Sequence, residues 1–163
     1  MGVSDWAIHS LAVGGGVLAI APIPGRSGDY AGDLAQLLEW APALVVTLTA
    51  QAEMDRKDAG GLGVALQAHD IAWRHCPITD FSVPDDDFDW PALRNHALSL
   101  LAQGQRVLVH CHGGCGRSGM VCLGLMVAAG EDPDAALTRL RALRPCAVET
   151  HAQMAWARGR CRA

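Results

Sequence analysis

The chain has few aromatic residues and little charge of either sign. Its 163 residues include one Tyr and two Phe, and Asp and Glu outnumber Lys and Arg by 17 to 13. The formal net charge of −4 argues against a protein drawn as a whole to nucleic acid or anionic lipid, since both attract excess positive charge. Leu, Val, Ala and five Trp must therefore supply most of the interior. At this length, a single domain over residues 1–163 is the expected organisation.

No segment has the features of an export signal or a membrane span. The N-terminal residues lack a basic start, and Trp6 stands where the myristoylation pattern requires Ser or Thr. Residues 10–25 are uncharged but contain several glycines and two prolines, and residues 119–130 are too few to cross a bilayer. We therefore expect a cytoplasmic protein that binds neither membrane nor nucleic acid.

Cysteine is present at positions 76, 111, 115, 122, 146 and 161. In a chain of this length without an export signal, free thiols are expected rather than a disulfide framework. Cys122 lies in an apolar run and is expected in the core. The sequence leaves open whether Cys76 or Cys115 forms a protective disulfide with an oxidised Cys111.

Hydrophobic patterning predicts strands that alternate with helices. Two short strands are expected within residues 6–23, joined near 14–16, and further strands at 44–48, 71–76 and 106–110. Helices are expected at 33–40, 63–68, 90–102, 119–129, 133–143 and 150–158. The alternation predicts an α/β fold of three layers, in which helices flank a central, mostly parallel sheet.

The segment at 107–119, Val-Leu-Val-His-Cys-His-Gly-Gly-Cys-Gly-Arg-Ser-Gly, combines a nucleophile with an anion-binding turn. A glycine-rich turn between strand and helix can point successive backbone N–H groups inward, and the helix adds its positive end. These dipoles, with Arg117 nearby, stabilise a thiolate at Cys111, which can attack phosphorus. The planar guanidinium of Arg117 can bind two phosphate oxygens at once.

This segment resembles the signature of the protein tyrosine and dual-specificity phosphatase superfamily, in which His-Cys precedes five residues, Arg, and Ser or Thr. The resemblance covers residues 44–156, is closest to small dual-specificity phosphatases, and implies the phosphotyrosine phosphatase-like fold. It implies that Cys111 is the nucleophile, that Ser118 eases departure of the thiolate, and that His110 supports the loop. The residues expected to bind phosphate are His112, Gly113, Gly114, Cys115, Gly116 and Arg117.

The family also uses an aspartate upstream of the cysteine as general acid. Asp80 lies 31 positions before Cys111, just past a predicted strand, and is the first choice. A second choice is Asp85, and three further aspartates follow closely: Asp86, Asp87 and Asp89. Near the carboxyl end, residues 143–153 resemble a segment that packs beside the loop, which implies that Gln153 helps place the hydrolytic water.

A second copy of the tetrapeptide Gly-Arg-Ser-Gly occurs at 25–28. Ile20 stands six residues before Arg26, so this copy has no nucleophile. It predicts a turn, from which Arg26 could reach the rim of the pocket.

The predicted function is hydrolysis of phosphate monoesters through a phosphocysteine intermediate, with a phosphorylated protein or small phosphate ester as partner. No metal or organic cofactor is expected, because His110, Cys111, His112 and Cys115 lack the second ligand pair of a zinc site, and Arg117 would repel the cation. Two alternatives stay open: a phosphate-recognising module with little turnover, and a sulfurtransferase or arsenate reductase with a similar loop. The sequence does not define the natural substrate or the oligomeric state.

Overall fold

A five-stranded sheet forms the centre of the molecule. The computed structural model describes residues 5–159. The strands are β1 (His9–Val13), β2 (Gly16–Ala21), β3 (Leu44–Thr47), β4 (Ala72–His75) and β5 (Arg106–His110). They lie in the order β1-β2-β5-β3-β4; β1 is antiparallel to β2, and the other three pairs are parallel. The prediction of a central, mostly parallel sheet is confirmed.

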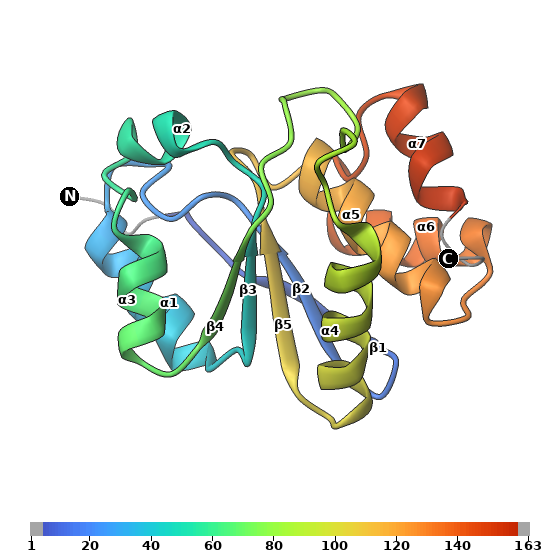
Figure 1. Cartoon of the computed structure of the whole chain (residues 1–163), viewed down its shortest axis with the longest axis horizontal. Coiled ribbons are helices and arrows are strands. Elements are labelled where there is room, and N and C mark those ends of the chain that lie inside the picture. The colour runs from blue at the N-terminus through green and yellow to red at the C-terminus, as the bar shows by residue number, and fades with distance from the viewer. Residues whose placement is uncertain (1–4, 160–163) are drawn as a thin grey trace.

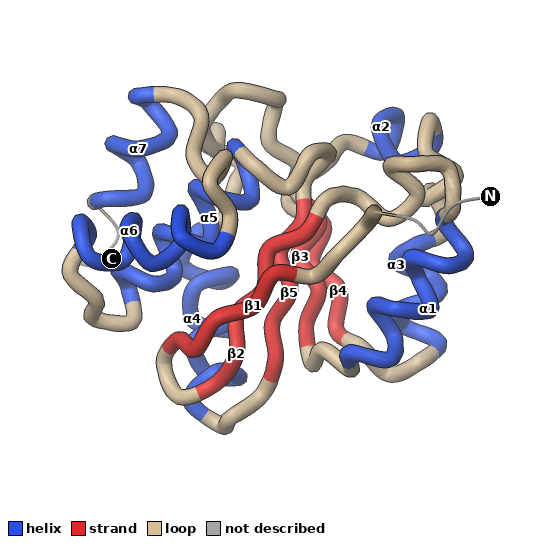
Figure 2. The backbone as a smooth tube through the Cα atoms, turned by 180° about the vertical axis from the view of Figure 1, so that it is seen from behind, coloured by secondary structure: helices blue, strands red, loops and turns tan. Residues whose placement is uncertain are grey.

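Helices cover both faces of this sheet, as Figure 1 shows. They are α1 (Tyr30–Trp40), α2 (Gln51–Asp55), α3 (Leu62–Ala68), α4 (Trp90–Ala102), α5 (Gly116–Ala128), α6 (Pro133–Leu143) and α7 (His151–Arg158). Helices α1 and α3 lie on one side and α4 and α5 on the other, with α6 and α7 packed against α5 (Figures 1 and 2). Over residues 5–159, no helix is both long and apolar enough to cross a membrane.

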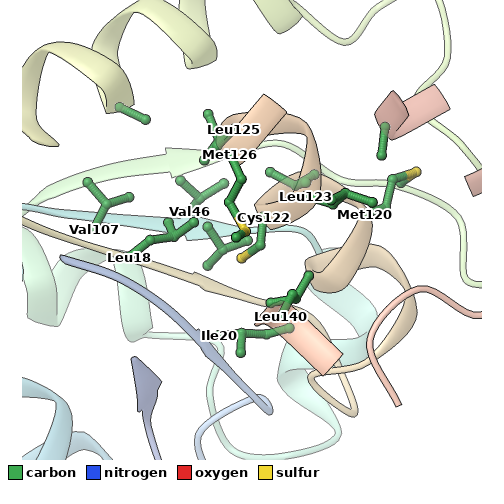
Figure 3. Packing of buried hydrophobic residues seen from close by; sticks show 14 of the residues in the cluster. Leu18, Ile20, Val46, Val107, Met120, Cys122, Leu123, Leu125, Met126 and Leu140 are labelled. Atoms are coloured by element: carbon green, nitrogen blue, oxygen red, sulfur yellow. The ribbon is translucent and has the colours of Figure 1, made fainter. Parts of the chain in front are cut away.

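Successive residues of the central strands enter two different hydrophobic clusters. Leu18 and Val46 pack on the α5 side, where Figure 3 shows them beside Cys122 and Met126. Their chain neighbours on the opposite face join the cluster formed with α1 and α3. Both faces of the sheet are therefore buried, which explains why these strands are unbroken apolar runs rather than alternating ones.

Most predicted elements are confirmed to within a few residues, and the differences arise at helix starts. Helix α1 begins at Tyr30 because the Asp29 side chain accepts a hydrogen bond from the Gly32 nitrogen at 3.0 Å and caps the helix. Helix α5 begins at Gly116, so the signature turn is shorter than predicted. The five-residue helix α2 was not predicted, because one turn is too short to show helical periodicity.

The parallel strands end along one edge of the sheet. The chain leaves β2, β3, β4 and β5 there through the segments 22–29, 48–50, 76–89 and 111–115. In parallel sheets this carboxyl edge is where ligands usually bind. Segments far apart in the sequence thus supply side chains to one site.

Candidate active site

The signature loop, residues 111–116, joins the buried strand β5 to helix α5. Gly114 has a φ of +69°, and a Cβ atom at this position would lie 2.6 Å from the backbone nitrogen of Pro22. Only glycine fits there without strain or collision. On the same side, the Ile23 nitrogen donates a hydrogen bond of 3.1 Å to the His112 carbonyl. The segment after β2 therefore holds the loop from outside.

A cavity of about 220 Å³ opens above this loop. Its walls come from the segments after β2, β4 and β5 and from the residue before the N-cap of α7. The lining residues are Arg26, Asp80, Phe81, Cys111, His112, Gly113, Cys115, Gly116 and Glu149. The structure thus brings Asp80 and Cys111 to one cavity and places Arg26 at its edge. We call it the active pocket.

Cys111 lies at the base of the active pocket and is 3% exposed. Its sulfur is 3.1 Å from the hydroxyl oxygen of Ser118, which is fully buried. The hydroxyl can donate this hydrogen bond to a thiolate, and charge-assisted bonds of this kind are the stronger ones. Since α5 begins at Gly116, the positive end of the helix also lies beside the sulfur.

A buried hydrogen-bonded chain supports the loop from behind. Burial, together with the charge of Arg117, lowers the pKa of His110 to about 4, so its imidazole is neutral at neutral pH. Its Nδ1 is 3.2 Å from the carbonyl oxygen of Cys111, which can only accept, so Nδ1 carries the proton. Nε2 then accepts from the Thr47 hydroxyl at 2.7 Å, and that hydroxyl accepts from Trp73 Nε1 at 2.8 Å. The chain fixes both the tautomer and the loop.

Arg117 lies beneath the active pocket, at 1% exposure, and binds Glu53 of α2. Its Nη1 and Nη2 each donate to one carboxylate oxygen at 2.9 Å, and Nη1 also donates to the Ile78 carbonyl at 3.0 Å. Burial alone would lower the pKa of Arg117, but the hydrogen bond to Glu53 and the negative groups around it raise that pKa overall. The guanidinium is therefore charged and held in one orientation.

One nitrogen of Arg117 has no hydrogen bond in the described part of the chain. This Nε is buried, and Asp80 Oδ1 lies 3.4 Å from it. A phosphate oxygen could accept from Nε, whereas Glu53 already engages the terminal nitrogens. The sequence-based expectation that Arg117 binds phosphate stays a prediction, and Nε is the atom available for it.

Asp80 projects from the loop after β4 into the active pocket. Its side chain is 53% exposed, and Oδ1 accepts a hydrogen bond of 2.9 Å from the Phe81 nitrogen. Three of the competing aspartates, Asp85, Asp87 and Asp89, line a different cavity. Asp80, the first choice from the sequence, therefore shares the active pocket with Cys111, and its role as general acid stays a prediction.

Gln153 connects α7 to the loop after β4, which carries Asp80. Its Oε1 accepts from the Glu149 and Thr150 nitrogens at 2.9 and 3.2 Å, and its Nε2 donates to the Ser82 carbonyl at 3.1 Å. The side chain is fully buried, and Glu149, rather than Gln153, lines the active pocket. The role of Gln153 in placing water stays a prediction, and its hydrogen bonds show a structural role in holding Ser82.

The expectation of free thiols is wrong for two cysteines. Cys115 and Cys146 form a disulfide with a Cα–Cα distance of 5.1 Å, whereas Cys76, Cys111 and Cys122 are free. Cys161 lies outside the described residues. The segment between α6 and α7 crosses the loop, since the Val148 nitrogen donates to the Cys115 carbonyl at 3.1 Å. Disulfides persist mainly in oxidising compartments, so this bond does not support the expected cytoplasmic location.

We predict that Cys146→Ser lowers the free energy of unfolding by about 2–4 kcal/mol, because the disulfide links residues 31 positions apart and restricts the unfolded chain. Urea denaturation measures this difference. In the presence of a thiol reductant the curves of the parent and the variant should coincide. A parent midpoint that does not respond to reductant would contradict the assignment of the bond.

Four residues of the site were not identified from the sequence. Glu53 and Thr47 act through contacts that only the fold creates, with Arg117 and His110 respectively. Phe81 and Glu149 line the active pocket. Phe81 directly follows Asp80, and Glu149 directly precedes Thr150, the residue at which the final helix was predicted to begin. Their position next to these residues is the sequence signal that could have identified Phe81 and Glu149.

Comparison with known proteins agrees with this geometry. The family model described as polymorphic toxin system, DSP-PTPase phosphatase matches residues 20–131, which run from the end of β2 through α5 and include the whole signature loop. The chain belongs to this family. DSP-PTPase denotes a dual-specificity and protein tyrosine phosphatase, so the resemblance stated from the signature is confirmed.

Relatives of this DSP-PTPase phosphatase include rat and mouse proteins named cyclin-dependent kinase inhibitor 3. The rat protein is 35% identical over 80 residues, and the mouse protein 34% over 79. The match covers 48% of this chain and only 37% of each relative, so the chain spans well under half of their length. The kinship thus concerns one segment of those proteins.

Solved structures share the fold over nearly the whole chain. Kinase associated phosphatase, in a form whose catalytic-site cysteine is replaced by serine, superimposes with a TM-score of 0.83 at 21% identity, covering 96% of this chain and 94% of its own. Tk-PTP in its active form gives 0.68 at 27% identity, with coverage of 93% and 95%. The phosphotyrosine phosphatase-like fold is therefore confirmed.

Proposed function

We propose that this chain hydrolyses phosphate monoesters of proteins through a phosphocysteine intermediate. The observation that carries the proposal is the meeting of the Cys111 sulfur and the Asp80 carboxyl group in one cavity of about 220 Å³ above the signature loop. A nucleophile and an acid on either side of one phosphoryl group are what a two-step displacement requires.

In the first step the Cys111 thiolate attacks phosphorus, forming the S–P bond while the P–O bond to the substrate breaks. Asp80 gives its proton to the leaving oxygen. In the second step water attacks the phosphocysteine, the S–P bond breaks, and the water proton passes to the Asp80 carboxylate. Ser118 donates a hydrogen bond to the departing thiolate, from its position at 3.1 Å.

Arg117 and the loop amides stabilise charge on the transferring group. Glu53 holds two guanidinium nitrogens at 2.9 Å, so Nε needs little reorganisation to donate a hydrogen bond to a phosphate oxygen. Such preorganised donors are usually the largest electrostatic contribution to catalysis. Asp80 Oδ1 lies 3.4 Å from this Nε.

Acid-quenched turnover tests this mechanism. During hydrolysis of an aryl phosphate, mass analysis of the peptides should find a phosphoryl group on Cys111. A phosphate-recognising module would bind but release no phosphate, and a sulfurtransferase would turn over thiosulfate instead. Either result would replace the proposal by the corresponding alternative.

Phe81 favours phosphotyrosine among the possible substrates. It is 61% exposed although apolar, lines the active pocket, and has a φ of +62°. A positive φ costs a bulky residue about 1–2 kcal/mol, and strain of this kind is concentrated at functional sites. In a chain with only two Phe, one is held at the mouth of the pocket, where its ring can pack on the phenyl group of the substrate.

We predict that Phe81→Gly lowers the preference for aryl over alkyl phosphates by about 2- to 10-fold, the value of an aromatic contact. Steady-state kinetics on both substrates measures the preference. Relief of about 1–2 kcal/mol of strain should offset the larger unfolded-state entropy of glycine, so the variant is at least as stable as the parent. Phe81→Tyr, which keeps the ring, should keep the preference. A glycine variant with unchanged preference would refute the assignment.

A further inference from the structure

One carboxylate of the active pocket has no role in the proposed mechanism. The lining residues include one arginine, Arg26, and two carboxylic acids, Asp80 and Glu149, of which the mechanism uses Asp80. Glu149 is exposed, and within residues 5–159 its carboxylate has no hydrogen-bond or ion-pair partner. A negative charge beside a bound phosphate dianion weakens binding unless a positive charge accompanies the phosphate. The partner of Glu149 is therefore to be sought in the substrate.

The carboxylate of Glu149 lies directly beside the signature loop. A Cβ atom on Gly116 would be 2.1 Å from Glu149 Oε1, so this oxygen lies against the residue at which α5 begins. Gly116 lines the active pocket as well and is one of the residues expected to bind phosphate. The charge of Glu149 is therefore close enough to act on a substrate whose phosphoryl group the loop holds.

The backbone holds Glu149 in this position from both sides. Its own nitrogen donates a hydrogen bond of 2.9 Å to Gln153 Oε1, and the nitrogen of Val148 donates one of 3.1 Å to the Cys115 carbonyl. Val148 is buried and has a φ of +68°, which is unfavourable for a β-branched residue. Strain of this kind is concentrated at functional sites. Here it accompanies a turn that places Val148 inside the protein and Glu149 at the active pocket.

We propose that Glu149 selects phosphopeptides in which a basic residue neighbours the phosphorylated residue. The guanidinium or ammonium group of that basic residue pairs with the Glu149 carboxylate while the phosphoryl group lies over Cys111. An acidic residue in the same place is repelled, so the carboxylate discriminates by attraction and by repulsion. The inference rests on the proposed phosphatase function and narrows its substrate class to basic phosphopeptides.

The test compares kcat/KM for synthetic phosphotyrosine peptides that carry arginine, glutamine or glutamate at one flanking position. Each position on either side of the phosphotyrosine is varied separately, because Arg26 lines the same pocket and favours an acidic residue wherever it is the nearer charge. At the position nearest to Glu149 we expect arginine to be preferred over glutamine by about 2- to 5-fold, the value of one exposed ion pair. Glutamate should be the poorest of the three.

Two substitutions of Glu149 test the origin of this preference. Glu149→Gln keeps the size of the side chain but removes the charge, and should bring the ratio between the arginine and glutamine peptides to near one. Glu149→Lys should reverse the order, so that the glutamate peptide becomes the best substrate of the three. Such a reversal is a result that misfolding cannot produce.

Glu39→Gln is the matched control for these variants. Glu39 is an exposed glutamate on α1 and does not line the active pocket, so its replacement removes the same charge elsewhere on the protein. This variant should keep the preference of the parent. Since salt screens exposed charges, the preference of both proteins should shrink at high salt.

The outcomes distinguish failure of the function from failure of the selection. If the protein releases no phosphate from an aryl phosphate, the proposed function is wrong and the selection by Glu149 falls with it. If it hydrolyses the aryl phosphate but treats all peptides alike, or if Glu149→Gln keeps the preference, the selection alone is wrong. If Glu149→Gln lowers kcat equally for every peptide and leaves the ratio unchanged, Glu149 acts in turnover itself, and the proposal is likewise overturned.

Discussion

Substitution of Cys111 by serine is expected to abolish phosphate release from an aryl phosphate, with a loss on the order of 10⁶-fold, as for removal of other covalent nucleophiles. The serine hydroxyl stays protonated at neutral pH and is a far weaker nucleophile than a thiolate. The change is small in volume, and within residues 5–159 the sulfur has one side-chain hydrogen-bond partner, the Ser118 hydroxyl, which can hydrogen-bond to either atom. The loss should therefore be chemical, with the fold and substrate binding retained.

Cys76→Ser is the matched control for this experiment. Cys76 is a free, partly buried thiol that lines the separate cavity with Asp85, and burial raises its pKa, which makes it a poor nucleophile. This variant should turn over aryl phosphates like the parent. If Cys111→Ser keeps measurable covalent turnover while Cys76→Ser loses it, the nucleophile has been assigned to the wrong residue.

The sheet and its helices could be predicted because their signals are local. The β-branched run at 44–48 and the apolar run before Cys111 correspond to the buried strands β3 and β5. Both faces of these strands are buried, and a strand of this kind is a continuous apolar run in the sequence. Helix α6 has Asp132 as its N-cap and Pro133 as its first residue, and both start signals can be recognised in the sequence. Helix α2 was not predicted, because a single turn is too short to show helical periodicity.

The residues of the candidate site likewise fall into two groups, those with a local sequence signal and those that only the fold brings together. Cys111, Ser118 and Asp80, to which the proposed mechanism gives the chemical roles, could be picked out by their spacing within the signature and upstream of it. The residues that hold them in place do not: Glu53 reaches Arg117 across 64 positions, and Thr47 reaches His110 across 63. Such pairs depend on which strands are neighbours in the sheet, and the order β5-β3-β4 is a property of the whole fold.

The disulfide was not predicted from the sequence either, because only the fold brings its two cysteines together. Cys115 and Cys146 have no distinctive spacing, and they meet because Arg144 and Val148 bring the segment after α6 onto the signature loop. The loop is therefore fixed by hydrogen bonds from His110 and Arg144 as well as by a covalent bond. A loop restrained from several sides keeps its N–H groups in place before substrate arrives, which is the preorganisation that electrostatic catalysis requires.

Asp80→Asn is expected to lower kcat by about 10²–10⁴-fold for substrates with a poor leaving group, the usual contribution of a general acid. An amide is nearly isosteric with the carboxyl group but cannot donate the proton that the leaving oxygen needs. Activated aryl phosphates, whose phenolate departs without help, should lose much less.

Asp85→Asn serves as the control, because Asp85 is exposed, carries the same charge and lines the other cavity. It should leave the kinetics unchanged. The contact of Asp80 with Arg117 is long, at 3.4 Å, and the Asp80 side chain is 53% exposed, so its loss should cost little stability. A slow but stably folded Asp80→Asn protein with an altered leaving-group dependence would identify the acid. If the variant equals the parent on a poor leaving group at every pH, the proton comes from elsewhere, and Glu149, the other carboxyl group lining the active pocket, becomes the next residue to replace.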